Sequence, residues 1–415
     1  MSLFRDKIIS LLRWSERYTK TDMVYLTSGG FWLVIGHVLQ IVSGIILAVA
    51  FANLVPKNTF GTYQFVMSVA AVLSAFTLTG MSAAVMRAVA RGSTGALRAG
   101  VRAQLQWSVA MVLAGAALAA YYFLKGNTTL SLSFLIAGSF SPFISAFGLS
   151  RSFFIGRQLF RESATFGFTR KVLPVAALVA TVFATHDVVT IVFVYFASNA
   201  LASALLYWQV LRTYKLPRSH DEEMVGYSKH LSAINIFSEI AGQADKVLIF
   251  HFLGAAPVAA YALAQLPVTH MRGLFKHVST MTLPKLSVAE FPALKATLPY
   301  KVRVFLFATL AAVVLYALAA PYFFALLFPA YPESVLLSQV LALTLLSVPR
   351  GLYGQALTAH KKKRALYITN ISHNTLKLIL LIVLLPLYGV WGAVAAILVS
   401  QLYFTLVTRY YFLRS

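Results

Sequence analysis

Twelve stretches of about 20 mostly apolar residues, separated by short polar segments, follow one another along the chain. A helix of about 20 residues rises roughly 30 Å, which matches the hydrocarbon core of a bilayer. The pattern therefore predicts an all-α polytopic membrane protein with twelve transmembrane helices. The predicted spans are 25–51, 60–84, 103–124, 129–150, 163–185, 189–211, 231–253, 258–281, 303–327, 335–358, 365–386 and 389–411.

The composition supports a membrane environment. Hydrophobic residues make up 59% of the chain and charged residues only 11%, and the mean hydropathy is +0.76. Soluble domains are about 25% charged, so this chain cannot cover itself with a polar surface. Cysteine is absent, which excludes disulfides and thiolate metal sites. We expect no metal and no cofactor.

The distribution of positive charge predicts the orientation. Only Lys57 and Lys125 fall in the short turns that join pairs of spans, whereas the longer loops on the opposite side carry nearly all other Lys and Arg outside the spans. The positive-inside rule then places both termini in the cytoplasm of a bacterial inner-membrane protein. The net charge of +23 follows from this topology, so no nucleic-acid partner is expected.

Two segments lie outside the predicted lobes. Residues 1–22 have Leu3, Phe4 and Ile8 on one helical face with basic residues around it, which predicts an amphipathic helix on the inner leaflet. A disordered basic tail is the alternative. Residues 213–230 are predicted to be a cytoplasmic linker with a solvated acidic run.

The two halves of the chain show a weak parallel repeat. Tyr63 and Tyr261 open spans two and eight after equivalent turns, at an offset of 198 residues, and Arg87 and Lys285 end those spans at the same offset. Six spans in each half preserve topology, so the halves should be related by an axis along the membrane normal. We therefore predict six-helix lobes over 23–212 and 231–415.

Ionisable and amide side chains inside the spans are the candidate functional residues. Such groups are costly in lipid and usually face a cavity or a partner. Spans seven, eight and eleven each carry them at helical spacing on one face. The candidates are Arg170, Lys171, Glu239, Gln243, Asp245, Lys246, Gln265, Arg272, Lys276, Arg350, Asn370, Asn374 and Lys377.

Several of these candidates have a structural alternative. Lys276 can extend to the inner headgroups, as can Arg170 and Lys171, and Lys246 can pair with an acid on its own span. Lys377 lies 13 residues beyond Arg364, or roughly 20 Å along the helix. It should therefore face water or substrate. The excess of cations predicts a positive cavity for an anionic ligand, and Arg is suited to two-point binding of phosphate.

Several motifs resemble those of a known family. They are Gly61-Thr62-Tyr63, the stretch GMSAAVMRAVAR at 80–91, Asp245-Lys246, Phe252-Leu253-Gly254, Tyr261-Ala262-Leu263-Ala264 and Leu283-Pro284-Lys285-Leu286-Ser287. With the twelve spans, these residues are similar to the polysaccharide-transport branch of the multidrug/oligosaccharidyl-lipid/polysaccharide exporter superfamily. The resemblance implies a V-shaped, two-lobed fold with alternating access. It also implies flipping of an undecaprenyl-diphosphate-linked oligosaccharide for O-antigen or exopolysaccharide assembly, alongside polymerase or ligase partners.

On this hypothesis the candidate residues take separate roles. Arg272, Arg350, Lys377 and Lys246 would bind the diphosphate, and Asn370, Asn374, Gln243 and Gln265 would bind sugar hydroxyls. Glu239 or Asp245 would carry a coupling proton or Na⁺. Arg170, Lys171 and Lys276 would contact lipid phosphate on the cytoplasmic side.

Three alternatives stay open. A cation-coupled multidrug or metabolite antiporter of similar fold would be expected to carry an acidic residue in its first span. That span offers only His37 and Gln40 here, with Asp22 at its very start. Peptidoglycan-precursor flippases tend to be longer, with extra spans. A membrane glycosyltransferase or polymerase would be expected to have a clustered acidic loop motif or a large outer loop. No catalytic constellation is evident, so we do not expect an enzyme.

Overall fold

The computed structural model describes residues 23–93, 95–217, 222–281, 286, 290–360 and 362–414. These residues are helical apart from short turns, as predicted. The N-terminal lobe consists of α2 (Met23–Leu54), α3 (Lys57–Ser74), α4 (Met81–Ala90), α5 (Ala96–Trp107), α6 (Val109–Leu124), α7 (Thr128–Phe147), α8 (Ser150–Gly156), α9 (Phe160–Ala184) and α10 (Val188–Tyr214).

The C-terminal lobe has the same general plan with longer helices. It consists of α11 (Glu222–Leu253), α12 (Ala255–Met281), α14 (Phe291–Leu327), α15 (Glu333–Ala342), the 3₁₀ segment η1 (Leu343–Ser347), α16 (Gly351–Ala359) and α17 (Lys363–Arg414). The last of these contains two predicted spans. Gly389 breaks it with φ 58° and ψ −143°, a backbone conformation that glycine adopts without a Cβ penalty.

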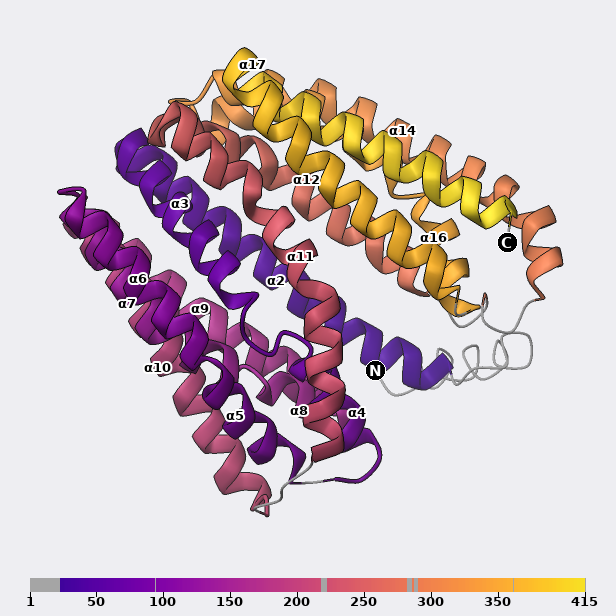
Figure 1. Ribbon diagram of the computed structural model, residues 1–415, viewed down its shortest axis with the longest axis horizontal. Coiled ribbons are helices and arrows are strands. Elements are labelled where there is room, and N and C mark those ends of the chain that lie inside the picture. Colours follow the sequence, from indigo (N-terminus) through magenta and orange to yellow (C-terminus); the bar gives the residue numbers. More distant parts are fainter. Residues whose placement is uncertain are drawn as a thin grey trace, which may run out of the picture.

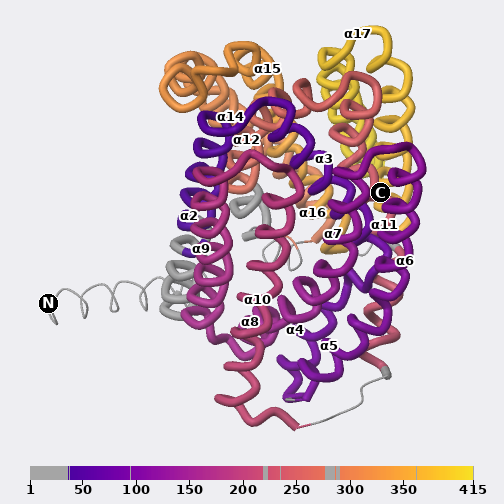
Figure 2. Tube along the Cα trace, turned by 90° about the vertical axis from the view of Figure 1, so that its left-hand side faces the viewer, coloured from indigo at the N-terminus to yellow at the C-terminus, as the bar shows by residue number. Residues whose placement is uncertain are grey.

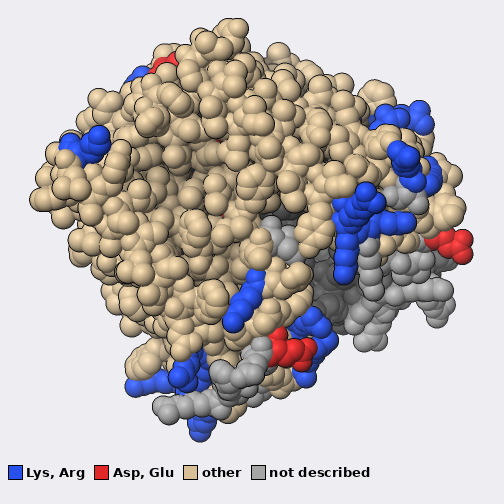
Figure 3. All heavy atoms as spheres, viewed as in Figure 1, with Lys and Arg blue, Asp and Glu red and all other residues tan. Residues whose placement is uncertain are grey.

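The two lobes form a V (Figure 1). They meet where the short turns lie, which we call the outer side, and they diverge toward the opposite side. Both ends of the described chain lie at the diverging ends. Seen from the side, α15 and α17 lie at one end of the molecule, and α4, α5 and α8 lie toward the other (Figure 2). On the face shown in Figure 3, most Lys and Arg side chains gather toward the open end of the V. We call this the basic side.

Helix packing repeats between the lobes. In the N-terminal lobe α2 packs on α9, α6 on α7, and α7 on α10. In the C-terminal lobe the equivalent pairs are α11 with the first half of α17, α14 with α15, and the α15–α16 span with α17. This recurrence fits the parallel repeat predicted from the offset between Tyr63 and Tyr261.

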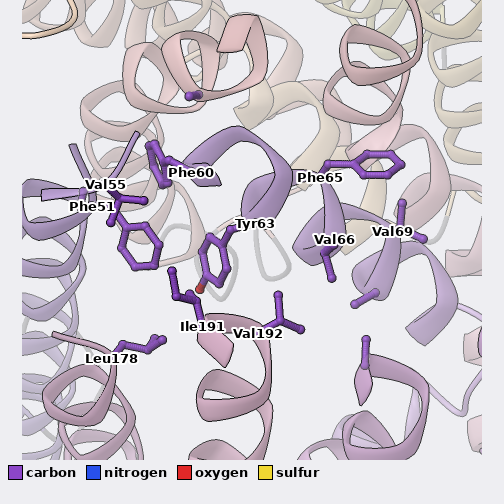
Figure 4. Close-up of a cluster of buried hydrophobic side chains, with 14 of the residues drawn as sticks. Phe51, Val55, Phe60, Tyr63, Phe65, Val66, Val69, Leu178, Ile191 and Val192 are labelled. Atoms are coloured by element: carbon purple, nitrogen blue, oxygen red, sulfur yellow. The ribbon is translucent and has the colours of Figure 1, made fainter. Parts of the chain in front are cut away.

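The contact between the lobes on the outer side is apolar and aromatic. One continuous cluster of buried residues joins Phe51 and Tyr63, both labelled in Figure 4, to Leu263 and Phe324. The rings of Phe65 in α3 and Phe250 in α11 stack with their centroids 3.7 Å apart. This apolar contact closes the V on the outer side.

One glycine permits the lobes to approach closely. A Cβ added at Gly61 in α3 would lie 1.8 Å from the backbone oxygen of Ala255, the first residue of α12. No side chain fits that space, so the beginnings of spans two and eight touch through backbone.

The observed helices refine the predicted spans. By length and hydropathy alone, seven described helices could cross a membrane, and α17 among them holds two spans. The helices α3, α11 and α12 carry more polar residues. Spans three, four and ten are divided near Ser108, Gly148 and Val348, and span two is divided at 75–80. Helix α11 begins nine residues before the predicted span, and α14 twelve residues before.

The predicted boundaries of the lobes and linker remain predictions, although α10 and α11 extend into residues 213–230. The predicted amphipathic helix of residues 1–22 lies outside the described residues.

Candidate functional site

A cavity of about 410 Å³ lies among the helices of the C-terminal lobe. Its walls come from α11, α12, α15, η1 and both halves of α17. We call it the basic cavity. It is lined by Ala241, Gly242, Gln243, Asp245, Lys246, Gln265, Val268, Thr269, Arg272, Leu341, Thr344, His373, Asn374, Lys377, Ile397, Ser400 and Gln401.

Seven of the thirteen candidate residues meet in this cavity, although they lie on three separate predicted spans. They are Gln243, Asp245, Lys246, Gln265, Arg272, Asn374 and Lys377. Helical spacing had predicted one face for Gln243 and Lys246, one for Gln265 and Arg272, and one for Asn374 and Lys377. The packing of α11, α12 and α17 brings those faces to the same cavity.

The Asp245 carboxylate organises one wall of the cavity. Its side chain is 4% exposed. One oxygen accepts hydrogen bonds from the Tyr261 hydroxyl at 2.7 Å and the Gln265 amide at 3.0 Å, and the other accepts from the Lys246 backbone N–H at 3.0 Å. The Gln265 amide also lies 2.6 Å from the Tyr261 hydroxyl. Buried carboxylates require such donors.

Two hydrogen bonds fix the opposite wall by joining α17 to α11. The Lys377 ammonium donates to the Ala241 carbonyl at 2.7 Å, and the Asn374 amide donates to the Ser238 hydroxyl at 3.0 Å. Lys377 therefore turns inward, as its depth in span eleven predicted. An ammonium has three donors, so this contact leaves others for water or a ligand.

The other two cations of the basic cavity have free donors. Neither the Lys246 ammonium nor the Arg272 guanidinium has a hydrogen-bond partner among the described residues, although both border the cavity. A guanidinium offers five N–H donors in a rigid fork. The cavity is therefore equipped to donate hydrogen bonds to an anion.

The charges in the basic cavity do not balance. Three cations line it against the single carboxylate of Asp245. Lys377 and Lys246 interact electrostatically with that carboxylate, but no ion pair within 4.0 Å joins them in the described chain. The ion pairs recorded there are Lys57–Glu333 and Arg91–Glu223, both outside the cavity. The excess positive charge remains available to a ligand.

The N-terminal lobe lacks this chemistry at equivalent positions. Helices α3 and α12 begin at the same offset of 198 residues that relates Tyr63 to Tyr261. That offset pairs Asp245, Lys246, Gln265 and Arg272 with Leu47, Ala48, Met67 and Ser74. The shared fold forms without charges there, so folding does not explain the charges in the C-terminal lobe.

Arg350 lies in a neighbouring groove rather than in the basic cavity. This groove, of about 290 Å³, runs between the span formed by α15, η1 and α16 and the second half of α17, and it shares Thr344 and Gln401 with the cavity. Span ten is interrupted at this point by η1 and a turn. Irregular backbone within a membrane is tolerated where it is buried in protein or borders a wet cavity.

The remaining candidates lie elsewhere. Glu239 and Asn370 are exposed, outside the residues that line the cavity, and the Asn370 amide donates to Leu366 of its own helix. Arg170 belongs to the N-terminal lobe, where its guanidinium donates to the Ile144 carbonyl at 3.3 Å. Lys171, beside it on α9, does not line the basic cavity. The side chain of Lys276 lies outside the described part.

Some lining residues were not among the candidates. Ser400 and Gln401 supply polar groups from the last span. Tyr261 does not line the cavity itself, but it is fully buried and donates its hydroxyl to Asp245. Ser400 and Gln401 are adjacent polar residues within an apolar span. The search for polar groups inside spans that selected candidates from spans seven, eight and eleven would have selected them too.

Comparisons with known proteins place this geometry in a family. Residues 26–289 match the model of the family described as polysaccharide biosynthesis protein. No curated protein matches the chain in sequence.

Solved structures with the same fold span nearly the whole chain. A lipid II flippase MurJ in an inward closed conformation has a TM-score of 0.66 at 16% identity, covering 92% of this chain and 87% of that one. A MATE structure in complex with MaD5 has a TM-score of 0.63 at 15% identity, covering 94% and 95%.

A third is a MOP superfamily transporter from Pyrococcus furiosus, described as having a binding pocket of reverse polarity. Its TM-score is 0.62 at 15% identity, covering 94% of this chain and 96% of that one. These likenesses establish the two-lobed fold. The match over residues 26–289, more than half of the chain, shows that the chain belongs to the family described as polysaccharide biosynthesis protein.

Proposed function

We propose that this protein flips a polyprenyl-diphosphate-linked oligosaccharide, an O-antigen or exopolysaccharide repeat unit, across the bacterial inner membrane. The observation that carries the proposal is the excess of cations in the basic cavity, where Lys246 and Arg272 keep free donors. A diphosphate supplies two adjacent anionic groups, and Arg binds such oxygens in two-point fashion.

The cavity offers separate contacts for the two parts of the headgroup. Arg272, Lys377 and Lys246 would hold the diphosphate. Gln243 and Asn374 would donate or accept hydrogen bonds with sugar hydroxyls, while the polyprenyl tail stays in lipid. The neighbouring groove with Arg350 borders the cavity, so Arg350 would meet the substrate during entry or exit rather than in the cavity itself.

Because the V is open on the basic side, the substrate would enter the basic cavity from the cytoplasm. The positive-inside rule supports placing that side, with both termini, in the cytoplasm. Rocking that closes the basic side and separates the outer contact would then expose the cavity outward. A polymerase or ligase of the same assembly pathway would receive the flipped unit.

Variants of the cavity cations test the proposal. Arg272→Gln and Lys377→Met should each lower flipping of a fluorescent polyprenyl-diphosphate oligosaccharide in proteoliposomes by about 10- to 100-fold, since a hydrogen bond to a charged group contributes about 1.5–3 kcal/mol. Arg212→Gln is the matched control, because that guanidinium lies 3.4 Å from the Trp208 ring centroid, outside the cavity. Flipping at the wild-type rate by both cavity variants would overturn the proposal.

A cation-coupled antiporter is the second candidate, favoured by one observation. Asp245 is a buried carboxylate in the cavity, and buried acids inside membranes often serve ion coupling. Asp245 and the exposed Glu239 remain the candidates for a coupling proton or Na⁺. The excess of cations in the cavity argues against a cationic drug as cargo. Efflux of a cationic dye that is lost in Asp245→Asn would therefore favour the antiporter over the flippase.

A further inference from the structure

A second basic site lies between the N-terminal lobe and the beginning of α11, away from the basic cavity. Residues of α5 and of the beginning of α11, which both lie toward the basic side in Figure 1, line a groove of about 980 Å³. We call it the lateral groove. Its walls include Arg98, Arg102, Trp107, Phe147, Tyr207 and Lys229, and small or apolar residues supply most of the rest.

Among the residues that the structure describes, three cations and no acid line the lateral groove. Arg98 and Arg102 lie one turn apart on α5, and Lys229 faces them from α11. The Arg98 Nε is buried and has no hydrogen-bond partner in the described part of the chain. A buried donor without a partner is costly, so a bound acceptor would satisfy it. The charge and the orphan donor both indicate an anionic group.

Aromatic side chains form the rim of the lateral groove that lies toward the middle of the membrane. The Lys229 ammonium lies 4.9 Å from the centroid of the Trp107 ring, which is 45% exposed. Phe147 and Tyr207 stack with their ring centroids 5.0 Å apart. Trp and Tyr prefer the membrane interface, where one end of the ring is apolar and the other is wet.

An apolar surface continues from this rim toward the middle of the membrane. Phe143, one turn deeper on α7, lies 6.1 Å from Phe147 between ring centroids and is exposed. Leu113 on α6, which continues the axis of α5 past Ser108, is 65% exposed. Cations, then aromatic rings, then exposed apolar side chains follow the order of a phospholipid from phosphate to acyl chain.

We propose that the lateral groove binds an anionic phospholipid of the leaflet on the basic side. Its phosphate would lie among Arg98, Arg102 and Lys229, and an acyl chain would follow Phe147 and Phe143. The site is independent of the proposed cargo. Because α5 belongs to the N-terminal lobe and α11 begins the C-terminal lobe, the bound lipid would join the two lobes.

Binding can be measured by fluorescence of the full chain in phosphatidylcholine vesicles. Trp107 is the reporter, and Trp107→Phe identifies its share of the signal among the five Trp. Brominated phosphatidylglycerol should quench Trp107 more than brominated phosphatidylcholine does. The selectivity for phosphatidylglycerol over phosphatidylcholine should fall by about fivefold for each cation removed. The triple variant Arg98→Gln, Arg102→Gln, Lys229→Gln removes all three.

Two controls separate this site from general surface charge and from misfolding. The variant Lys295→Gln, Lys301→Gln, Arg303→Gln removes three cations near the start of α14 and should keep the selectivity. Arg98→Lys with Arg102→Lys keeps the charge and should retain most of it.

Three outcomes would overturn the proposal. They are unchanged selectivity in the groove variant, an equal loss in the α14 variant, and displacement of the lipid by millimolar inorganic phosphate, which would indicate a free-anion site.

Discussion

One ion pair holds the lobes together on the outer side, and its removal should shift the conformational equilibrium by a predictable amount. The Lys57 ammonium in the N-terminal lobe lies 2.7 Å from the Glu333 carboxylate in the C-terminal lobe, and 4.7 Å from the centroid of the Tyr331 ring. Burial, with the Glu333 charge nearby, raises the pKa of Tyr331 to about 12. The ring therefore stays neutral at all working pH values.

The magnitude follows from the exposure of the pair. The Lys57 and Glu333 side chains are 40% and 45% exposed, so solvent screening limits their attraction to about 0.5 kcal/mol. The contact of Lys57 with an aromatic face adds about 0.5 kcal/mol at an exposed site. Lys57→Gln should therefore reduce the outward-closed population about fivefold relative to the outward-open one, and Glu333→Gln about twofold.

Distances between spin labels at the outer ends would measure that shift. The absence of native cysteine allows labels to be placed at Lys125→Cys and Tyr388→Cys, both exposed in outer turns of different lobes. The exchanged pair Lys57→Glu with Glu333→Lys should restore part of the closed population, because the ion pair returns without the contact to Tyr331. Higher salt should weaken the wild-type effect.

The reasoning fails if the exchanged pair behaves no better than Lys57→Glu alone. It also fails if Lys57→Gln and Glu333→Gln shift the distance distribution equally, since only Lys57 makes both contacts.

Three further predictions concern single positions. Gly61→Val should prevent the outer ends from closing, because a Cβ would overlap the Ala255 oxygen. Greater alkylation of a cysteine placed at Val55, which is 6% exposed in the outer cluster, measures this, and unchanged labelling contradicts it. Tyr261→Phe should destabilise the protein by about 1.5–3 kcal/mol, since it removes a hydrogen bond to a buried carboxylate; a thermal melt in detergent that matches wild type would oppose this. Asp187→Ala should lower the stability of the protein by about 0.5–1 kcal/mol, because it removes the N-cap of α10. Hydrogen bonds, first from the Thr190 backbone N–H, lower the pKa of Asp187 below its ordinary 3.8, so the wild-type advantage in stability is present above pH 3.8 and disappears as the pH falls through the lowered pKa. An advantage that persists in acid refutes the cap.

The sequence predicted the fold because lipid imposes a simple rule on it. Each span must be long and apolar, and positive charge must gather on one side. Gly389 illustrates what the rule leaves out. The two last spans were separated correctly, but the single-residue reversal between them depends on a positive φ that hydropathy does not report.

The candidate site was predictable in part for a related reason. Arg272, Lys377 and Asp245 were selected because charge inside a span is costly, and they meet in one cavity. Arg350 obeyed the same rule but faces a different groove, because span ten breaks beside it. The direction of a side chain after an irregular turn cannot be derived from helical periodicity. Tyr261 was missed as a site residue because a Tyr in lipid needs no special explanation until its partner is known.

The backbone contact at Gly61 has a mechanical consequence for transport. Helix α12 has 27 residues and so extends about 40 Å from that contact. A rotation of about 10° at this fixed end would move its far end by about 7 Å, while the outer end moves hardly at all. As long as that contact holds, a small change in the angle between the lobes would give a large change in aperture on the basic side, and the outer side would stay closed.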